Sequence, residues 1–380
     1  MNLSIIIPVY NKSEYLTECI ESVQRQSLKD SEIICVDDGS TDGSAELVSE
    51  FQKTDGRVCL IRQQNLGAGA ARNAGVKAAK GEYVAFLDAD DFYSSKDTLA
   101  RIYAAAKSNN ALICGGSFCE IRSDERVIQF DGVMSGNKFD AEGWVDFKDY
   151  QFDYGFYRFI YNRDFLIKNN LIFPDYLRYQ DPPFMLRAFD AAGRFYAIPD
   201  VTYCYRINDC PVKWTTEKVL DLLCGIEENL KFSATRGYER VHALNYYRLC
   251  NDFCGVIVDT ALRKDSTGNI LKKLADMQSS VNFDMIKSSE LFTDKENKFT
   301  LINMDVYVFY ADGTVRINLR NIFYIYQLNR PFLCLYSKRK VLVYHLIHIH
   351  HILAYHEGNF EYNGIVKITQ VKACHFLKLV

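Results

Sequence analysis

Short apolar runs alternate with amphipathic stretches through the first part of the chain. The apolar runs lie at residues 4–9, 32–36, 58–61 and 83–87 and show little polar alternation. Such a run is typical of a strand covered on both faces, whereas the spacing of Leu16, Ile20 and Val23 indicates an amphipathic helix between the first two runs. This alternation predicts an α/β fold with a mostly parallel sheet sandwiched by helices.

The same pattern continues to about residue 208. Residues 111–118 and 198–206 are predicted to add two strands to the sheet, and the polar, turn-rich residues 120–143 are interpreted as a loop over a site. Residues 154–165 are dense in aromatic side chains. Packing between the sheet and its helices is the preferred interpretation of these rings, and stacking of one or two of them on a bound sugar is the alternative.

Beyond residue 208 the pattern becomes helical. Apolar residues at helical spacing in residues 219–230, and a second helix-like stretch at residues 247–262, predict a largely helical C-terminal appendage. The pair Asp312-Gly313, flanked by apolar runs, predicts a β-hairpin. We therefore predict three parts: a domain at residues 1–208, a mainly helical region at 209–330, and a tail at 331–380.

Composition excludes several classes of protein. The 380 residues are 48% hydrophobic, enough for real cores, and the net charge of −3 gives no basic footprint for nucleic acid. The twelve cysteines are scattered without a Cys-x-x-Cys pair, which indicates reduced core residues. The first apolar run is too short for a signal-peptide core, and no run reaches the roughly eighteen apolar residues of a membrane span. A cytoplasmic location is expected.

Acidic residues follow two of the predicted strands. Asp37 and Asp38 end the second run, and Asp88, Asp90 and Asp91 end the fourth. In open parallel sheets, ligands bind beyond the carboxyl ends of the strands, and carboxylates suit Mg²⁺ or Mn²⁺, which accept phosphate oxygens. We interpret this edge as a metal–diphosphate site. The alternatives are that the first pair belongs to a tight loop and that the second cluster caps the next helix.

A glycine- and alanine-rich segment opens the helix before the fourth strand. Gly67 and Gly69 suggest a dinucleotide fingerprint, but Arg72 stands where its third glycine belongs, so we reject a nicotinamide site. Arg72 is able to pair with a phosphate or with one of the acids, and the alternative is a surface arginine.

Four blocks together resemble a known family. Ser-Ile-Ile-Ile-Pro-Val-Tyr-Asn, Val-Asp-Asp-Gly-Ser-Thr-Asp-Gly-Ser, Asn-Leu-Gly-Ala-Gly-Ala-Ala-Arg-Asn-Ala-Gly and Phe-Leu-Asp-Ala-Asp-Asp are similar, in order and spacing, to the inverting glycosyltransferases of family two. The resemblance covers about the first hundred residues. It implies a Rossmann-like GT-A fold with a nucleotide-binding half at residues 1–100 and an acceptor half at 101–208. It also implies a place in bacterial capsule, exopolysaccharide or lipopolysaccharide assembly.

The resemblance assigns roles to residues of the donor site. It implies that Pro8 and Tyr10 border the base pocket, that Asp38 meets a uracil ring, and that Arg72 lies near the nucleotide.

The Asp-x-Asp motif of the family matches Asp88-Ala89-Asp90. It implies that Asp90 is the direct ligand of Mn²⁺ or Mg²⁺ and that Asp88 lies nearer the ribose or a metal-bound water.

The family's general base is the Asp of a Glu-Asp pair before a short helix, and here that pair is Gln180-Asp181. The resemblance assigns the base to Asp181, and the Gln removes a neighbouring charge that would raise its pKa. By local sequence alone, a helix N-cap before Pro182 and Pro183 is the preferred interpretation of Asp181. Arg206 is predicted to reach a phosphate or to form a structural ion pair.

The tail has an unusual composition. It holds six of the seven histidines and the basic run Lys338-Arg339-Lys340. No acid or cysteine stands at ligand spacing around these histidines, so contact with anionic lipid headgroups is favoured over zinc.

The sequence thus predicts a metal-dependent inverting transferase that moves a sugar from a nucleotide-diphosphate sugar, a UDP-sugar by resemblance, to a glycan or lipid-linked oligosaccharide. Two alternatives stay open: a sugar-nucleotide pyrophosphorylase or nucleotidyltransferase, and a non-catalytic carbohydrate-binding assembly protein.

Overall fold

A computed structural model describes residues 1–93, 95–122, 125–130, 132–207, 212–289 and 291, and four strands between residues 307 and 345. The chain forms two compact units. One holds Met1–Val308 with Asn318–Phe323, and the other holds Phe309–Ile317 with Tyr324–Val380.

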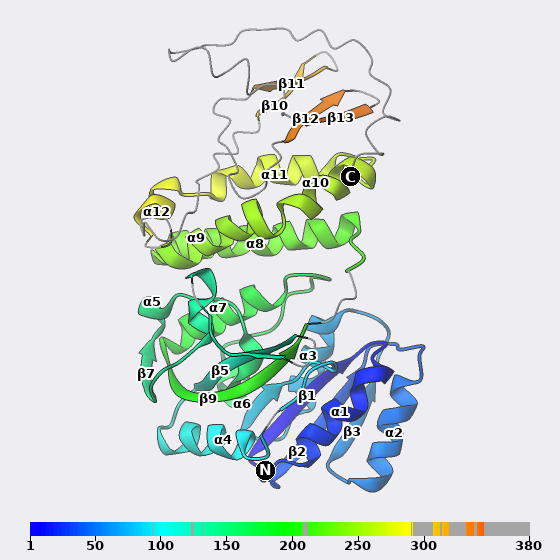
Figure 1. Ribbon diagram of the computed structural model, residues 1–380, viewed down its shortest axis with the longest axis vertical. Helices are drawn as coiled ribbons and strands as arrows, with labels where there is room; N and C mark the ends of the chain where they lie inside the picture. Colours follow the sequence, from blue (N-terminus) through cyan, green and yellow to red (C-terminus); the bar gives the residue numbers. More distant parts are fainter. Residues whose placement is uncertain are drawn as a thin grey trace. The chain divides into compact units, whose positions relative to one another are not determined.

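A nine-stranded sheet forms the centre of the larger unit (Figure 1). Six strands run in the same direction: β1 (Leu3–Val9), β2 (Ser31–Asp37), β3 (Val58–Arg62), β4 (Tyr83–Phe86), β5 (Ile113–Arg122) and β9 (Arg194–Arg206). Three run the other way: β6 (Glu125–Val127), β7 (Gly143–Asp146) and β8 (Phe159–Asn162). The sheet order is β3-β2-β1-β4-β8-β5-β9-β7, with β6 beside β5. The predicted mostly parallel sheet is confirmed.

Helices cover both faces of this sheet. The helices before β8 are α1 (Ser13–Gln24), α2 (Ser44–Thr54), α3 (Ala68–Ala78), α4 (Thr98–Ser108) and α5 (Phe147–Tyr150), and those after it are α6 (Arg163–Lys168) and α7 (Asp181–Ala192). Because crossovers between parallel strands are right-handed, the order β3-β2-β1-β4 places α1 and α2 on one face and α3 on the other. Gly75 lets α3 approach β1, since a Cβ there would overlap the side chain of Ile6.

The aromatic segment is part of the core. Phe156, Tyr157, Phe159 and Tyr161 are at most 5% exposed, and Phe86 of β4 contacts both Phe156 and Tyr161. The packing interpretation is therefore confirmed for these four rings. The polar segment before them is not only a loop, since it contains β6 and the 3₁₀-helix Gly132–Asn137.

A second, helical core follows the sheet domain. Its helices are α8 (Thr216–Arg236), α9 (Glu239–Tyr247), α10 (Cys254–Arg263), α11 (Asn269–Met277) and α12 (Phe283–Ser288), and α9, α10 and α11 each pack against α8 or its neighbours (Figure 1). The single helix predicted at residues 247–262 is wrong in detail. The chain instead ends α9, makes a π-helical turn at Arg248–Asp252, and begins α10. No helix among the described residues is long and apolar enough to cross a membrane.

The last described strands form two small sheets. β10 (Tyr307–Ala311) pairs with β11 (Thr314–Asn318), so the predicted hairpin strands are confirmed, while Asp312 and Gly313 themselves lie outside the described residues. β12 (Phe332–Ser337) pairs with β13 (Lys340–His345) in antiparallel fashion. The rest of the predicted tail, including Lys338, Arg339 and most of its histidines, also lies outside the described residues.

The pairing of β5 with β8, in which Gly115 lies opposite Phe159, yields a stability prediction. A Cβ on Gly115 would overlap the buried ring of Phe159, whereas a Cβ on Gly143 would meet nothing within 4 Å. We expect Gly115→Ala to reduce the free energy of unfolding by about 1–3 kcal/mol through overpacking, and Gly143→Ala to change it much less. Urea unfolding of both variants measures the difference, and equal midpoints would contradict this packing.

Candidate active site

Three neighbouring parallel strands deliver polar residues to one edge of the sheet. The carboxyl ends of β2, β1 and β4 lie side by side. The segment after β1 carries Lys12, the segment after β2 carries Asp38, and the segment after β4 carries Asp88, Asp90 and Asp91. Since ligands of such sheets bind beyond this edge, these side chains define the candidate site.

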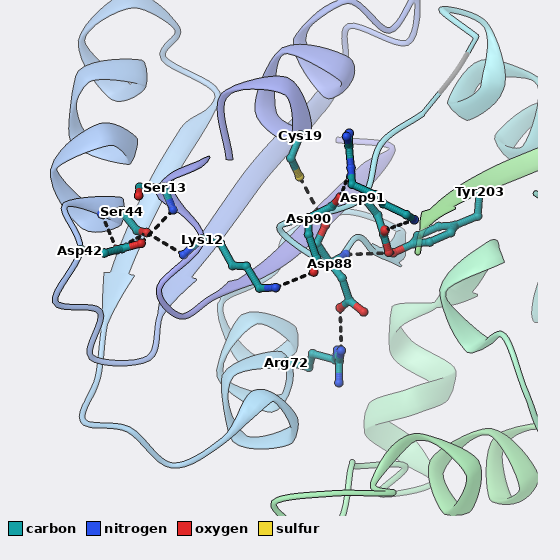
Figure 2. A network of polar contacts seen from close by, with 11 residues as sticks. Lys12, Ser13, Cys19, Asp42, Ser44, Arg72, Asp88, Asp90, Asp91 and Tyr203 are labelled. Carbon is teal, nitrogen blue, oxygen red and sulfur yellow. Dashed lines mark hydrogen bonds and ion pairs between the residues drawn. The ribbon is translucent and has the colours of Figure 1, made fainter. Parts of the chain in front are cut away.

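Asp88 is paired with an arginine from α3. Its Oδ1 accepts a hydrogen bond from Nη2 of Arg72 at 2.6 Å (Figure 2). Arg72 is 4% exposed and lies over the rings of Phe156 and Phe173, at 4.8 and 5.3 Å from their centroids. Burial alone would lower the pKa of Arg72, but the charges of Asp88 and Asp181 raise it. The alternative of a surface arginine is wrong.

Arg72 also has donors to spare. Its Nε and Nη1 atoms are buried and have no hydrogen-bond partner among the described residues. A buried N–H without an acceptor costs free energy, so two of them beside a carboxylate indicate a place for an anionic ligand.

Asp90 is paired with a lysine that the sequence analysis did not identify. Nζ of Lys12 lies 2.5 Å from Oδ2 of Asp90 (Figure 2). Partial burial alone would lower the pKa of Lys12, but the hydrogen bond to Asp90 and the charges of Asp88 and Asp91 raise it. The signal in the sequence was the position of Lys12 just after β1, at the edge where the acids were expected.

Asp91 has a different environment from its two neighbours. It is 1% exposed; its Oδ2 accepts from the hydroxyl of Tyr203 at 2.6 Å and its Oδ1 from the backbone N–H of Arg206 at 2.7 Å. The same Tyr203 hydroxyl accepts the backbone N–H of Asp88 at 3.1 Å (Figure 2). Asp91 therefore fastens the acidic turn to β9, and burial raises its pKa well above the ordinary value.

The alternative of helix capping for these acids is wrong, because the next helix begins at Thr98 with Asp97 in the cap position. Arg206 forms the structural ion pair that was one of its two predicted roles. Its Nη2 lies 2.5 Å from Oε2 of Glu18, and its Nε donates to the carbonyl of Asp90 at 3.1 Å.

The loop after β2 is held by its own acids. Asp38 is 3% exposed and accepts hydrogen bonds from the side chain of Gln63 and from the backbone N–H groups of Leu66 and Gly67, at 2.7–2.9 Å. It thereby fixes the glycine-rich segment that leads into α3.

Asp42 accepts hydrogen bonds from Ser44 and from the backbone N–H of Ser13 (Figure 2). Burial alone would raise the pKa of Asp42, but these hydrogen bonds lower it to about 2.

Pro8 and Tyr10 flank the same edge. Pro8 pairs with Val36 near the end of β1, and Tyr10, 47% exposed, follows the strand. Their contact with a base, like that of Asp38, stays a prediction.

Asp181 begins α7 and is partly exposed as a residue. The helix cap is Gln180, which makes no side-chain capping bond, so the capping alternative for Asp181 is wrong. Burial raises the pKa of Asp181, while the charges of Arg72 and Arg178 partly oppose that rise and the charge of Asp88 adds to it. Asp181 therefore lies within electrostatic reach of the Arg72–Asp88 pair.

The oxygen atoms of Asp88 and Asp90 are the donors here that suit a divalent cation. Within the described part of the chain, no group of three or more His, Cys, Asp and Glu side chains forms a metal cage. Mg²⁺ and Mn²⁺ bound beside phosphates need only one or two carboxylates, because the phosphate and water supply the other ligands. The residues present fit that type of site.

Comparison with known proteins identifies the sheet domain. The family model described as "Glycosyl transferase family 2" matches residues 4–169. The chain is 36% identical over 212 residues to "Uncharacterized glycosyltransferase EpsJ" of Bacillus subtilis, a match of 54% of this chain but 61%, under two thirds, of EpsJ. It is 32% identical over 216 residues to "Glycosyltransferase GlyG" of Streptococcus pneumoniae, a match of 54% of this chain and 70% of GlyG.

Solved structures support the same fold. The crystal structure of S. aureus TarS residues 1–349 in complex with UDP has a TM-score of 0.60 and 17% sequence identity, covering 84% of this chain and 97% of that one. The same TarS fragment with UDP-GlcNAc gives the same values. The predicted GT-A fold with a helical C-terminal region is thus confirmed.

The geometry around Asp181 predicts a shift in its titration. Arg72 lowers the pKa of Asp181 through its charge. Arg72→Met removes that charge and keeps a side chain of similar length, so the pKa of Asp181 should rise further. The ¹³C carboxyl resonance of Asp181, identified by its loss in Asp181→Asn, measures this. An unchanged or lower pKa would show that the two groups are not in electrostatic contact.

Proposed function

The chain belongs to glycosyltransferase family 2, and from this premise we propose that it transfers a sugar from a UDP-sugar to a hydroxyl of a glycan or lipid-linked glycan, with inversion at the anomeric carbon, in cell-surface polysaccharide assembly. The observation that carries the proposal is the Arg72–Asp88 ion pair beside Asp90, together with the effect of the charges of Arg72 and Asp88 on the pKa of Asp181. UDP as the nucleotide is supported by the UDP and UDP-GlcNAc bound to TarS.

The donor's diphosphate would lie between the acids and Arg72. Asp90, with Asp88 beside it, would hold Mn²⁺ or Mg²⁺, and such an ion neutralises the charge that develops on the departing diphosphate. Arg72 offers two buried nitrogen atoms, Nε and Nη1, whose N–H groups lack acceptors among the described residues and are suited to phosphate oxygens. Lys12 would be a second cation beside the diphosphate. For this, its ammonium group would leave Asp90 and contact a phosphate oxygen.

Asp181 would be the general base. It accepts the proton of the attacking hydroxyl, and a carboxylate whose pKa is raised by burial is a better proton acceptor than one in water. Because the acceptor attacks the donor directly and a single base assists, one displacement occurs and the anomeric configuration inverts. A retaining route would need a second carboxylate as nucleophile.

The acceptor would approach from the side of Asp181. A lipid-linked acceptor would bring the enzyme to the inner surface of the membrane, and the basic run at residues 338–340 of the sequence is suited to anionic headgroups.

A nucleotide-release assay tests the reaction class. Purified chain with Mn²⁺ is incubated with UDP-glucose, UDP-GlcNAc, UDP-galactose or GDP-mannose, and both nucleoside diphosphate and pyrophosphate are measured. We expect UDP from at least one donor through slow transfer of its sugar to water. With a glycan acceptor added, we expect a glycoside whose ¹H NMR anomeric coupling is inverted relative to the donor. Release of pyrophosphate would point to a nucleotidyltransferase, and binding without release would point to an assembly protein.

Variants of Asp181 and Asp90 should separate the chemical step from donor binding. Asp181→Asn is expected to lower kcat by about 10²- to 10⁴-fold while UDP binding persists, because only the base is lost. Asp90→Ala is expected to lose the Mn²⁺-dependent part of UDP binding. Calorimetry with UDP and Mn²⁺ and the release assay measure both, with the exposed Asp164 changed to Asn as the matched control. Full activity in either variant would remove that residue from its role.

Lys12 should compete with the metal ion. A half-exposed ion pair such as Lys12–Asp90 contributes about 1 kcal/mol, so Lys12→Met should raise the affinity for Mn²⁺ by up to about five-fold in the absence of nucleotide. Electron paramagnetic resonance of free Mn²⁺ reports the affinity. Lys53→Met, which breaks an exposed pair with Glu50 on α2, is the control. Weaker Mn²⁺ binding by Lys12→Met would contradict a site at Asp90.

A further inference from the structure

The segment that leads into Asp181 lies along one face of α8. The backbone N–H of Leu177 donates to Oδ2 of Asp221 at 2.8 Å, and the hydroxyl of Tyr176 donates to Oε2 of Glu228 at 3.2 Å. Between these two acids, Gly225 faces Tyr179. Positions 221, 225 and 228 are spaced by four and three residues and so share one face of the helix. Residues 176–179 are therefore attached to α8 at three successive turns.

Tyr179 is the anchor of this segment. Its φ of +67° is left-handed, a conformation that costs free energy for a residue with a Cβ. The residue is 8% exposed, and its ring packs edge-on against Phe253. Among the described residues before position 208, it alone is a buried member of the apolar cluster built around α8, which includes Val219, Leu223 and Ile226. Tyr179 thus joins the two cores two residues before Asp181.

The Tyr179 hydroxyl is held from two sides. It accepts a hydrogen bond from Nη1 of Arg248 at 3.0 Å and donates one to Oδ1 of Asn245 at 3.1 Å. Arg248 belongs to the π-helical turn between α9 and α10. Such turns interrupt helices at a cost and occur frequently at functional sites.

Arg248 also forms a buried ion pair, with Asp153. Nη1 of Arg248 lies 2.7 Å from Oδ1 of Asp153, which is fully buried and precedes the aromatic segment. Oδ2 of Asp153 accepts from the side-chain amides of Asn229 on α8 and Asn245 on α9, at 3.0 and 2.9 Å. The desolvation of two buried charges offsets most of their attraction, so such a pair contributes little net stability but fixes geometry strongly.

We propose that α8, α9 and the π-helical turn position the catalytic carboxylate, with Tyr179, Gly225 and Arg248 as positioning residues for Asp181. The inference rests on the role of Asp181 in the proposed function. The left-handed backbone of Tyr179 sets where α7 begins, and hence where the carboxylate lies. A misplacement of about 1 Å in a reacting group costs on the order of 10²-fold in rate, so small shifts at Tyr179 are sufficient to affect catalysis.

Two glycines of the helical region give a matched test. A Cβ on Gly225 would lie 2.9 Å from the carbonyl oxygen and from Cδ1 of Tyr179, so the segment must shift, whereas a Cβ on Gly255 of α10 would meet nothing within 4 Å. Both glycines are helical, Gly225 in the middle of α8 and Gly255 in the first turn of α10, so alanine adds helix propensity of at most about 1 kcal/mol at either position. Only the first variant disturbs Tyr179.

Kinetics and binding separate positioning from folding. With the best donor and Mn²⁺, we expect Gly225→Ala to lower kcat for UDP release by at least about ten-fold and to change the Kd of UDP with Mn²⁺ by less than about two-fold. Gly255→Ala should leave both values unchanged. Tyr179→Phe should lower kcat in the same way, with Tyr103→Phe, which removes a hydroxyl bonded to Asn2 and Glu82, as its control. Equal kcat values within each pair would overturn the proposal.

Arg248 requires a variant that does not leave a buried charge unpaired. Arg248→Met combined with Asp153→Asn removes both charges, and we expect the double variant to fold, to bind UDP and to have a lowered kcat. Unchanged kcat in a folded double variant would overturn the role of Arg248.

Hydrogen exchange keeps the inference separate from the proposed function. Amide exchange in residues 175–182 should be faster in Gly225→Ala than in Gly255→Ala, and equal exchange would overturn the positioning role whether or not a donor is turned over. If Asp181→Asn is fully active while exchange differs as expected, the base assignment fails and the attachment of the segment to α8 stands. If Asp181→Asn is inactive and exchange does not differ, the positioning role fails alone.

Discussion

Acidic side chains gathered at one edge of a sheet repel one another, and this site depends on the groups that balance each of them. Asp88 has Arg72 from α3, and Asp90 has Lys12 from the segment after β1. Asp91 is held within the described part of the chain by two neutral donors, the hydroxyl of Tyr203 and the backbone N–H of Arg206. These partners come from three different parts of the chain, α3, the segment after β1 and β9, so the site exists only when the sheet is assembled.

The balancing contacts differ in how easily they exchange. Asp91 and Asp38 are buried with neutral donors that belong to the fold, so they maintain the shape of the edge. Lys12 and Asp90 are partly exposed, and a pair in that environment is weak enough to open for a ligand. The buried hydrogen bonds of Asp38 and Asp91 thus keep the shape of the edge fixed, while the Lys12–Asp90 ion pair is able to open. Fixed polar groups of this kind are what preorganised electrostatic catalysis requires.

The sequence predicted the strands and helices of the sheet domain and the acids that follow β2 and β4, because buried strands and acidic strand ends are local signals. Asp88 and Asp90 were recognised as acids at a strand end, and strand order places them beside the segments that follow β1 and β2. Asp181 was assigned by family resemblance alone, because it begins α7 and follows no strand. Lys12 was missed because a lysine beside a helix start has no distinctive pattern. Asp91 was grouped with its neighbours because three adjacent acids look alike until Tyr203, more than a hundred residues away, distinguishes one of them. The left-handed Tyr179 and its contact with α8 are products of tertiary packing that no local spacing encodes.

The central claim is that the acids after β4 and Asp181 face one site that holds a nucleotide sugar. A crystal structure of the chain with UDP and Mn²⁺ tests it most directly. The account predicts Mn²⁺ on Asp90, diphosphate oxygens bonded to Arg72, Lys12 displaced from Asp90, and the Asp181 carboxylate facing the open side of the diphosphate. UDP bound away from this edge, or a wall of side chains between the diphosphate and Asp181, would contradict it.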